Sequence, residues 1–182
     1  FTQKHPRVRV ELRDLSSTEM LEGLQSGELD VAVRVAPAKE SPDFDWTVVK
    51  QQGWRLAMNR NHALAAKKTV HAADLNDQKM VLFCKEHYPE YWTGVTSWFR
   101  DQGINARVAG EYDGVTSLVS AVEAGLGAAL VTEGLGHLFP DRLLLKSIEP
   151  EPTPVCIAAG RSKDRLEEPI LAVFVEELKR AV

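Results

Sequence analysis

Residue patterns typical of strands and of helices alternate along almost the whole chain. Residues 8–13 alternate apolar and polar side chains with the two-residue period of a half-buried strand. A helix is expected next, because Ser16 and Glu19 have the spacing of a capping box and Gly27 is a typical residue after a helix end. The apolar run 29–33 then predicts a second strand. This order predicts a βαβ unit with parallel strands.

The alternation continues to the last residues. Further strands are predicted at residues 47–50, 54–58, 80–84, 107–112, 128–131, 143–148 and 155–159. Helices are predicted near Ala72, on the apolar positions from Tyr91 to Phe99, on those from Val115 to Val122, and on Leu166, Ile170, Phe174 and Leu178. Repeated alternation of this kind predicts an α/β fold with parallel sheets.

Charge and length narrow the classes of function. The 182 residues, 44% of them hydrophobic, are enough to bury a sizeable core. The net charge of −4 comes from interspersed acids and bases, so the chain lacks the basic face with which a domain binds duplex DNA. No apolar run is long enough to cross a bilayer, so we expect no membrane partner.

Signatures of catalysis and of metal binding are missing from the sequence. The five histidines are scattered, without a metal-binding pair on a helix, and there is neither a nucleophile elbow nor a phosphate-binding loop. Cys84 and Cys156 lie in apolar runs and are expected to be buried thiols. A redox-sensing role stays open for Cys84, which Lys85 and His87 follow. We therefore predict no catalytic residue, no metal and no cofactor.

Four motifs, in their order and spacing, resemble the effector-binding domain of LysR-type transcription regulators. They are the Phe-x-x-x-His-Pro-x-Val-x-Val-x-Leu pattern at residues 1–12, LEGLQSGELDVAV at 21–33, Asn-His-Ala-Leu-Ala at 61–65 leading to Asp74-Leu75, and VEAGLGAALV at 122–131. Each motif is weak alone, but together they cover nearly the whole chain. The resemblance implies a bacterial, cytoplasmic regulator.

The resemblance implies a fold like that of periplasmic binding proteins of type 2. Two Rossmann-like subdomains would be joined by two crossover strands, with subdomain I formed by residues 1–58 plus 154–182 and subdomain II by 59–153. The family's first strand and most of its first helix would precede Phe1, so they are absent from the chain. We expect the resulting gap in the first sheet to be filled by tag residues, another chain or further residues of the protein, because unpaired buried backbone is costly.

The effector is expected in a cleft between the two subdomains, at strand ends and helix N-termini. The residues predicted to bind it are Ser16, Ser17, Thr18, Arg34, Phe83, Cys84, Lys85 and Thr116. The hydroxyl groups could instead be simple helix caps, and Phe83 could belong to the core. Arg34 could clamp a carboxylate with its planar fork or form a surface ion pair, and Val35 is the alternative residue in its register.

The function expected from these features is ligand sensing. A small metabolite, a carboxylate or another anion, would alter DNA binding by a winged helix-turn-helix domain that this chain lacks. The resemblance also implies a homodimer or homotetramer, with DNA bound only through the missing domain. Two alternatives remain: a solute-binding protein of a transporter, marked by a signal peptide, and an enzyme on the same frame, marked by turnover of a metabolite.

Overall fold

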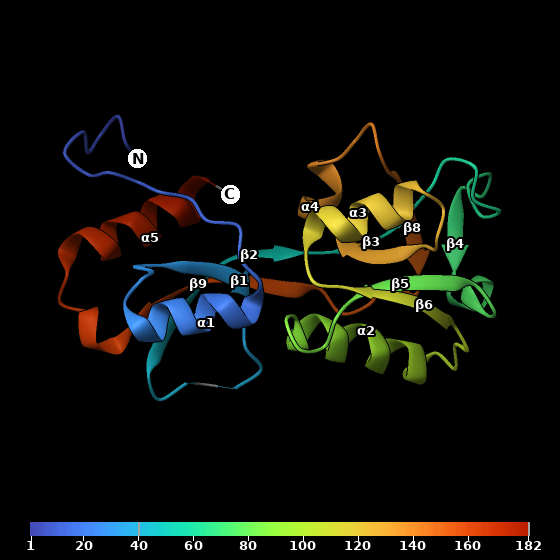
Figure 1. Cartoon of the computed structure of the whole chain (residues 1–182), viewed down its shortest axis with the longest axis horizontal. Helices are drawn as coiled ribbons and strands as arrows, with labels where there is room; N and C mark the ends of the chain where they lie inside the picture. Colours follow the sequence, from blue (N-terminus) through green and yellow to red (C-terminus); the bar gives the residue numbers. More distant parts are fainter. Residues whose placement is uncertain (40, 182) are drawn as a thin grey trace. The chain divides into compact units, whose positions relative to one another are not determined.

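The computed structural model describes residues 1–39 and 41–181, which form two compact units (Figure 1). Unit 1 comprises residues 1–51 and 156–182, and unit 2 comprises residues 52–155. The chain therefore passes between the units twice, at Gln51–Gln52 and at Val155–Cys156. The predicted fold also has two segments that cross between its subdomains.

Unit 1 contains a three-stranded sheet and two long helices. Its elements are α1 (Ser17–Ser26), β1 (Ala32–Val35), β2 (Phe44–Gln52), β9 (Val155–Ser162), the 3₁₀ helix η2 (Lys163–Arg165) and α5 (Pro169–Ala181). The strand order is β1-β9-β2, and β1 runs antiparallel to β9 with Ala32 opposite Gly160. β1 therefore lies at an edge of this sheet.

The predicted first strand and the predicted parallel βαβ unit are wrong for this structure. Residues 8–13 form no strand, and β1 pairs with β9 in the antiparallel sense. The alternation of Val8, Val10 and Leu12 is suited to a sheet, but a strand also needs a neighbouring backbone to pair with. Leu12 in this segment is 91% exposed.

Unit 2 holds the larger share of the secondary structure. Its elements are β3 (Trp54–Met58), β4 (Thr69–His71), the 3₁₀ helix η1 (Ala72–Leu75), β5 (Lys79–Phe83), α2 (Pro89–Asp101), β6 (Arg107–Tyr112), α3 (Val115–Glu123), β7 (Ala129–Thr132), α4 (Glu133–His137) and β8 (Leu144–Glu149). They form a four-stranded sheet of order β4-β8-β3-β7 and a two-stranded sheet of β5 and β6. A bridge between Met80 and Ala128 links the two sheets.

The sheets of unit 2 mix strand directions. β5 is parallel to β6 and β4 is parallel to β8, whereas β3 runs antiparallel to both β7 and β8. The prediction of strands and helices agrees with the structure over most of this unit, but the prediction of parallel sheets throughout is wrong. The pairing of β3 also places residues 54–58 in unit 2, whereas the predicted division lies after residue 58.

The core of unit 2 lies between its sheets and the helices α2 and α3. Leu56, Leu82, Leu118 and Leu130 are fully buried there. Helix α2 contributes the buried face predicted for it, with Tyr91, Val95, Trp98 and Phe99 all below 9% exposure. Burial of side chains of this size stabilises the unit by roughly 1.5–3 kcal/mol each. This core holds the ends of β5 and β6, where several predicted site residues lie.

Within the described residues, no helix combines the length and apolarity needed to span a bilayer. The same residues contain no group of three or more His, Cys, Asp or Glu side chains arranged to hold a metal ion.

Candidate functional site

The predicted N-terminus of helix α1 is confirmed in detail. Ser16 is the N-cap, and its Oγ accepts a hydrogen bond from the backbone N–H of Glu19 at 3.3 Å. The Glu19 carboxylate in turn accepts from the backbone N–H of Ser16 at 2.7 Å, which completes the capping box. The helix ends at Gly27, whose φ of 78° is a left-handed value that glycine adopts without strain. Both ends of α1 are thus set by local sequence.

Arg34 lies beside this helix start. It belongs to β1, is only 5% exposed, and its Nη1 donates a hydrogen bond to the backbone oxygen of Ser17 at 3.2 Å. At this degree of burial, Arg34 differs from an exposed surface charge. The structure therefore brings Ser16, Ser17 and Arg34 together in unit 1, with Thr18 half-buried in the first turn of the same helix.

Trp46 is a component of this site that the sequence alone did not indicate. Its ring lies on β2, 5.8 Å from the guanidinium carbon of Arg34, within the range of a cation–π contact. Gly160 on β9 leaves the space for it, since a Cβ at that position would overlap the Trp46 ring. Trp46 Nε1 is buried and has no hydrogen-bond partner among the described residues. The sequence signal for this contact is Gly160, because a glycine within a strand often marks the close approach of another group.

In unit 2, three predicted site residues follow one another at the end of β5. Phe83 is buried and packs against the rings of Tyr88 and Tyr91 at 4.4 and 4.9 Å, so it belongs to the core. Cys84 is half-buried with a free thiol, and its backbone N–H donates to the oxygen of Tyr112 at 2.9 Å. Lys85 is exposed. The ends of β5 and β6 therefore meet, as expected for parallel neighbours.

Thr116 lies just beyond the end of β6, in the first turn of α3. The N-cap of this helix is Gly114, which has no side chain to cap with, and Thr116 is exposed. The hydroxyl of Ser117 is used locally, donating to the backbone oxygen of Gly114 at 3.0 Å. Thr116 and Lys85 are thus accessible polar groups at the strand ends of unit 2.

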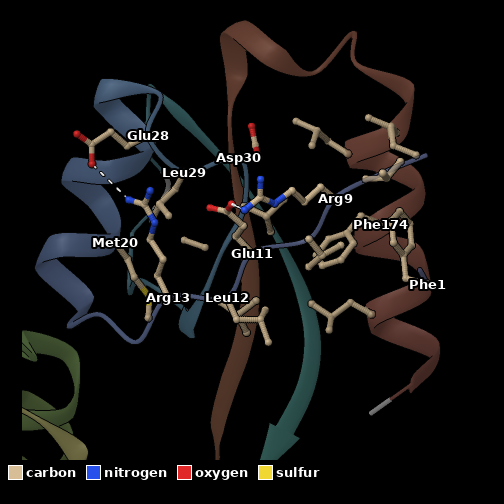
Figure 2. Close-up of a pocket in the computed structure, with 18 of the residues that line it drawn as sticks. Phe1, Arg9, Glu11, Leu12, Arg13, Met20, Glu28, Leu29, Asp30 and Phe174 are labelled. Carbon is tan, nitrogen blue, oxygen red and sulfur yellow. Dashed lines mark ion pairs between the residues drawn. The ribbon is translucent and has the colours of Figure 1, made fainter. Parts of the chain in front are cut away.

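A pocket described within unit 1 contains none of the eight predicted residues. It has a volume of about 580 Å³ and lies between residues 8–13, β1 and α5 (Figure 2). Apolar side chains from α5 line it, among them Ile170, Phe174 and Leu178. Residues 8–13, whose alternation predicts a half-buried strand, line this pocket instead of pairing in a sheet.

Charged groups lie at the rim of this pocket. Arg165 pairs with Asp30 at 2.6 Å and with Glu168 at 2.5 Å, and the ion pair holds the pKa of Glu168 below its usual range. Across the pocket, Arg13 lies 3.6 Å from Glu28 (Figure 2). These charges already have partners within the chain, so the pocket offers mainly apolar surface and backbone.

The whole chain, residues 1–182, matches the family model described as the LysR substrate binding domain. Among curated proteins, the transcriptional regulator BudR of Raoultella terrigena is 27% identical over 135 residues, which are 74% of this chain and 47% of that protein. The chain spans about half the length of the first curated relatives that it matches.

Solved structures match the fold along its full length. The regulatory domain of CcmR from Synechocystis PCC6803, in complex with 2-PG, has a TM-score of 0.82 and 19% identity, covering 100% of this chain and 86% of that one. Full-length CbnR bound to its target DNA has a TM-score of 0.81 and 24% identity, covering 100% of this chain and 62% of that one. At these identities, the two likenesses show a shared fold.

Proposed function

Because the chain belongs to the LysR substrate binding domain family, we propose that it is the effector-sensing domain of a transcription regulator. Its ligand is a small anionic metabolite, a carboxylate or a related acid. Ligand binding alters DNA binding by a winged helix-turn-helix domain, which residues 1–182 do not contain. The observation that carries the proposal is the buried guanidinium of Arg34 at the start of α1.

Two positive features coincide at this place in unit 1. The N-terminus of a helix carries a partial positive charge and N–H groups that point outward. Arg34 adds a full positive charge, hydrogen-bonded to Ser17 in the first turn. A planar guanidinium can form two parallel hydrogen bonds with a carboxylate or phosphate group, which a lysine cannot. The chemistry therefore favours an anion over a neutral ligand.

The position of Trp46 favours a ligand that has a flat or an acidic group. The indole lies 5.8 Å from the guanidinium carbon, and Arg34 is only 5% exposed, so electrostatic interactions there are stronger than in open water. Its buried Nε1–H also lacks an acceptor among the described residues. A bound ligand oxygen would supply one and remove a cost of about 1–3 kcal/mol.

In unit 2, we propose that Cys84, Lys85 and Thr116 contact the effector. Lys85 and Thr116 are exposed at the ends of neighbouring parallel strands, where α/β sheets usually bind ligands. Phe83 supports them from the core through its contacts with Tyr88 and Tyr91. Its role is to position this strand end.

The regulator acts, on this proposal, as a homodimer or homotetramer in the cytoplasm. An effector changes such an assembly only if it binds one arrangement of the protein more tightly than the other. Full-length CbnR, which has this fold, has been solved in complex with its target DNA. This supports the proposal that the regulator containing this chain also binds DNA. No role in a transporter is proposed, since the matched relatives are transcription regulators.

The experiment is a thermal-shift screen of small carboxylates, aromatic acids and 2-PG, followed by calorimetry on the compounds that raise Tm. A ligand that binds only the folded state increases the free energy of unfolding, by about 2.7 kcal/mol at a ligand concentration of a hundred times Kd. Tm therefore rises with ligand concentration. Neutral alcohols of matched size are the control. A shift with the neutral compounds alone would overturn the anionic assignment, and turnover of any compound would support an enzyme instead.

A further inference from the structure

One of the two chain segments that join unit 2 to unit 1 is rich in proline. Residues 150–154 read Pro-Glu-Pro-Thr-Pro and lie in unit 2, between β8 and β9. Each proline fixes its own φ and holds the residue before it in extended backbone, so this segment has little freedom to bend. The other connection, at Gln51–Gln52, leads through Gly53 directly into β3.

Trp54, the first residue of β3, is bonded to the proline-rich segment at two points. Its backbone N–H donates to Oε1 of Glu151 at 2.9 Å, and its indole Nε1–H donates to the backbone oxygen of Thr153 at 3.0 Å. Trp54 is only 2% exposed, and hydrogen bonds that are shielded from water are electrostatically stronger than exposed ones. The start of β3 and the proline-rich segment are therefore held to each other.

Arg55 adds the start of α4 to this arrangement. Its Nη2 pairs with the carboxylate of Glu133, and its Nη1 lies 3.6 Å from Oε1 of Glu151. The same Nη1 donates to the backbone oxygen of Trp54 at 2.7 Å. The guanidinium thus contacts residues of three segments that are far apart in the sequence.

Two glycines allow these segments to lie so close together. A Cβ at Gly53 would overlap the carboxylate of Glu151, and a Cβ at Gly134 would overlap the side-chain amide of Gln52. The backbone N–H of Glu133 donates to the oxygen of Gly53 at 3.0 Å, and that of Gly134 donates to Oε1 of Gln52 at 3.2 Å. We call this cluster the clamp, and it comprises residues 52–55, 133–134 and 151–153, all of unit 2.

Aromatic rings connect the clamp to the end of β5. The ring centroid of Trp54 lies 5.9 Å from that of Tyr91 in the first turn of α2, and Tyr91 lies 4.9 Å from Phe83, the last residue of β5. All three side chains are below 9% exposure. Because protein interiors are close-packed, displacement of one of these rings displaces its neighbour. Cys84 and Lys85, two of the proposed effector contacts, follow Phe83 directly.

We propose that the clamp carries a displacement of the end of β5 to both connections between the units at once, with Arg55 as the positioning residue that keeps its three segments together. Effector contact at one strand end then reaches both chain segments through which unit 2 is joined to unit 1. That an effector causes the displacement rests on the proposed function, whereas the coupling within unit 2 does not.

Whether the clamp opens as one body is tested by hydrogen exchange, followed by NMR on residues 1–182. The reporters are the amides of Trp54, Glu133 and Gly134 and the indole N–H of Trp54, whose signal is identified by its loss in Trp54→Phe. Arg55→Met should speed the exchange of all these hydrogens by at least about tenfold, because the clamp then opens locally. Exchange of the core amide of Leu82 should change by less than about twofold.

Two further variants show whether the effect belongs to the clamp. Arg107→Met is the matched control, since Arg107 pairs with Asp77 at 3.2 Å and is 71% exposed, and this change should leave the clamp hydrogens unaffected. Arg55→Lys keeps the positive charge and should restore part of the protection. Faster exchange of the Trp54 amide alone would show that the segments open separately. Equal acceleration throughout unit 2 would show that Arg55 only stabilises the fold, and either result would refute the proposal.

The coupling to the end of β5 is tested with a second pair of variants. Phe83→Leu loosens the contact with Tyr91 and should speed exchange of the Trp54 indole hydrogen by about fivefold or more. Phe99→Leu is the control, because Phe99 is also buried, at 8% exposure, but packs against Trp98 at 5.8 Å. It should leave the Trp54 indole unaffected. No effect of Phe83→Leu, or equal effects of the two changes, would contradict the coupling.

These measurements need no effector, so their outcome is separate from that of the thermal-shift screen. A screen in which no compound binds would count against the proposed function only. Unchanged exchange of the clamp hydrogens in Arg55→Met and Phe83→Leu would count against the coupling only.

Discussion

Arg34 Nη1 donates a hydrogen bond to the backbone oxygen of Ser17, 17 residues earlier in the chain, at 3.2 Å. This contact joins the start of helix α1 to the adjacent strand β1 and fixes a positive charge at the helix N-terminus. The pair links two sequence features, a capping box and an arginine at the end of an apolar run, that are separate in the sequence.

Replacing Arg34 is expected to weaken effector binding. With the carboxylate that raises Tm most in the screen, Arg34→Lys should lower the affinity about tenfold and Arg34→Ala about a hundredfold, because charge-assisted hydrogen bonds are lost. Calorimetry measures both affinities, and circular dichroism verifies that the fold is retained. Arg100→Ala, at a side chain that is 75% exposed in unit 2, is the matched control. Equal affinity in Arg34→Ala and wild type would remove this residue from the site.

Removing the N-cap should destabilise unit 1. Ser16→Ala loses the hydroxyl that accepts from Glu19 and is expected to cost about 1 kcal/mol of unfolding free energy. Ser16→Asp, which keeps a capping oxygen, should recover most of this loss. Urea denaturation followed by circular dichroism measures both values. Equal losses in the two variants would mean that the capping hydrogen bond is not what stabilises this helix end.

A methyl group at Gly160 should disturb the position of Trp46. Gly160→Ala places a Cβ where the Trp46 ring lies, and we expect a loss of about 1–3 kcal/mol and a shift in tryptophan fluorescence. Gly94→Ala is the control, because a Cβ there meets nothing within 4 Å on helix α2. That change should stabilise the protein by about 0.5–1 kcal/mol. Stable folding of Gly160→Ala with unchanged fluorescence would contradict the close packing.

The hydroxyl of Thr116 is expected to contribute to affinity and not to stability. Thr116→Val keeps the shape of an exposed side chain and removes its hydrogen-bonding group, so affinity for the effector should fall several-fold while Tm stays within experimental error. Thr93→Val on helix α2, also exposed, is the matched control and should leave affinity unchanged. A similar affinity for both variants would exclude Thr116 from the site.

The ionisation of Asp74 should make the stability of the protein depend on pH. Lys67 lies 2.6 Å from its carboxylate, and the backbone N–H of His71 donates to it at 2.9 Å; both contacts lower the pKa of Asp74. A lowered folded-state pKa contributes stability above the ordinary value of 3.8, and this contribution disappears as the pH falls through the folded-state pKa. Lys67→Met should raise the pKa of Asp74, as measured by NMR titration, whereas Lys68→Met should not.

The local elements of this fold could largely be predicted from its sequence. Ser16, Glu19 and Gly27 define the ends of α1 because caps depend on a few neighbouring residues. The buried face of α2 follows from its helical spacing of apolar residues. Local patterns determine such features, and the sequence therefore contains what is needed to predict them.

Pairing between distant segments could not be predicted in the same way. Residues 8–13 have the pattern of a strand, but whether they form one depends on a partner that the pattern does not specify. The antiparallel pairing of β1 with β9 joins residues more than 100 positions apart. The contact between Trp46 and Arg34 could not be predicted either, because it depends on the order of strands in the sheet and not on local sequence.

The division of unit 1 between residues 1–51 and 156–182 has a consequence for how the protein forms on the ribosome. Unit 2 is one continuous stretch, and it can fold as soon as it has emerged. Unit 1 must wait, because β9 pairs with β1 and is made more than 100 residues later. Until then its apolar segments are exposed to chaperones and proteases, so premature termination at the end of unit 2, before β9 is made, should yield a folded unit 2 attached to an unfolded leader.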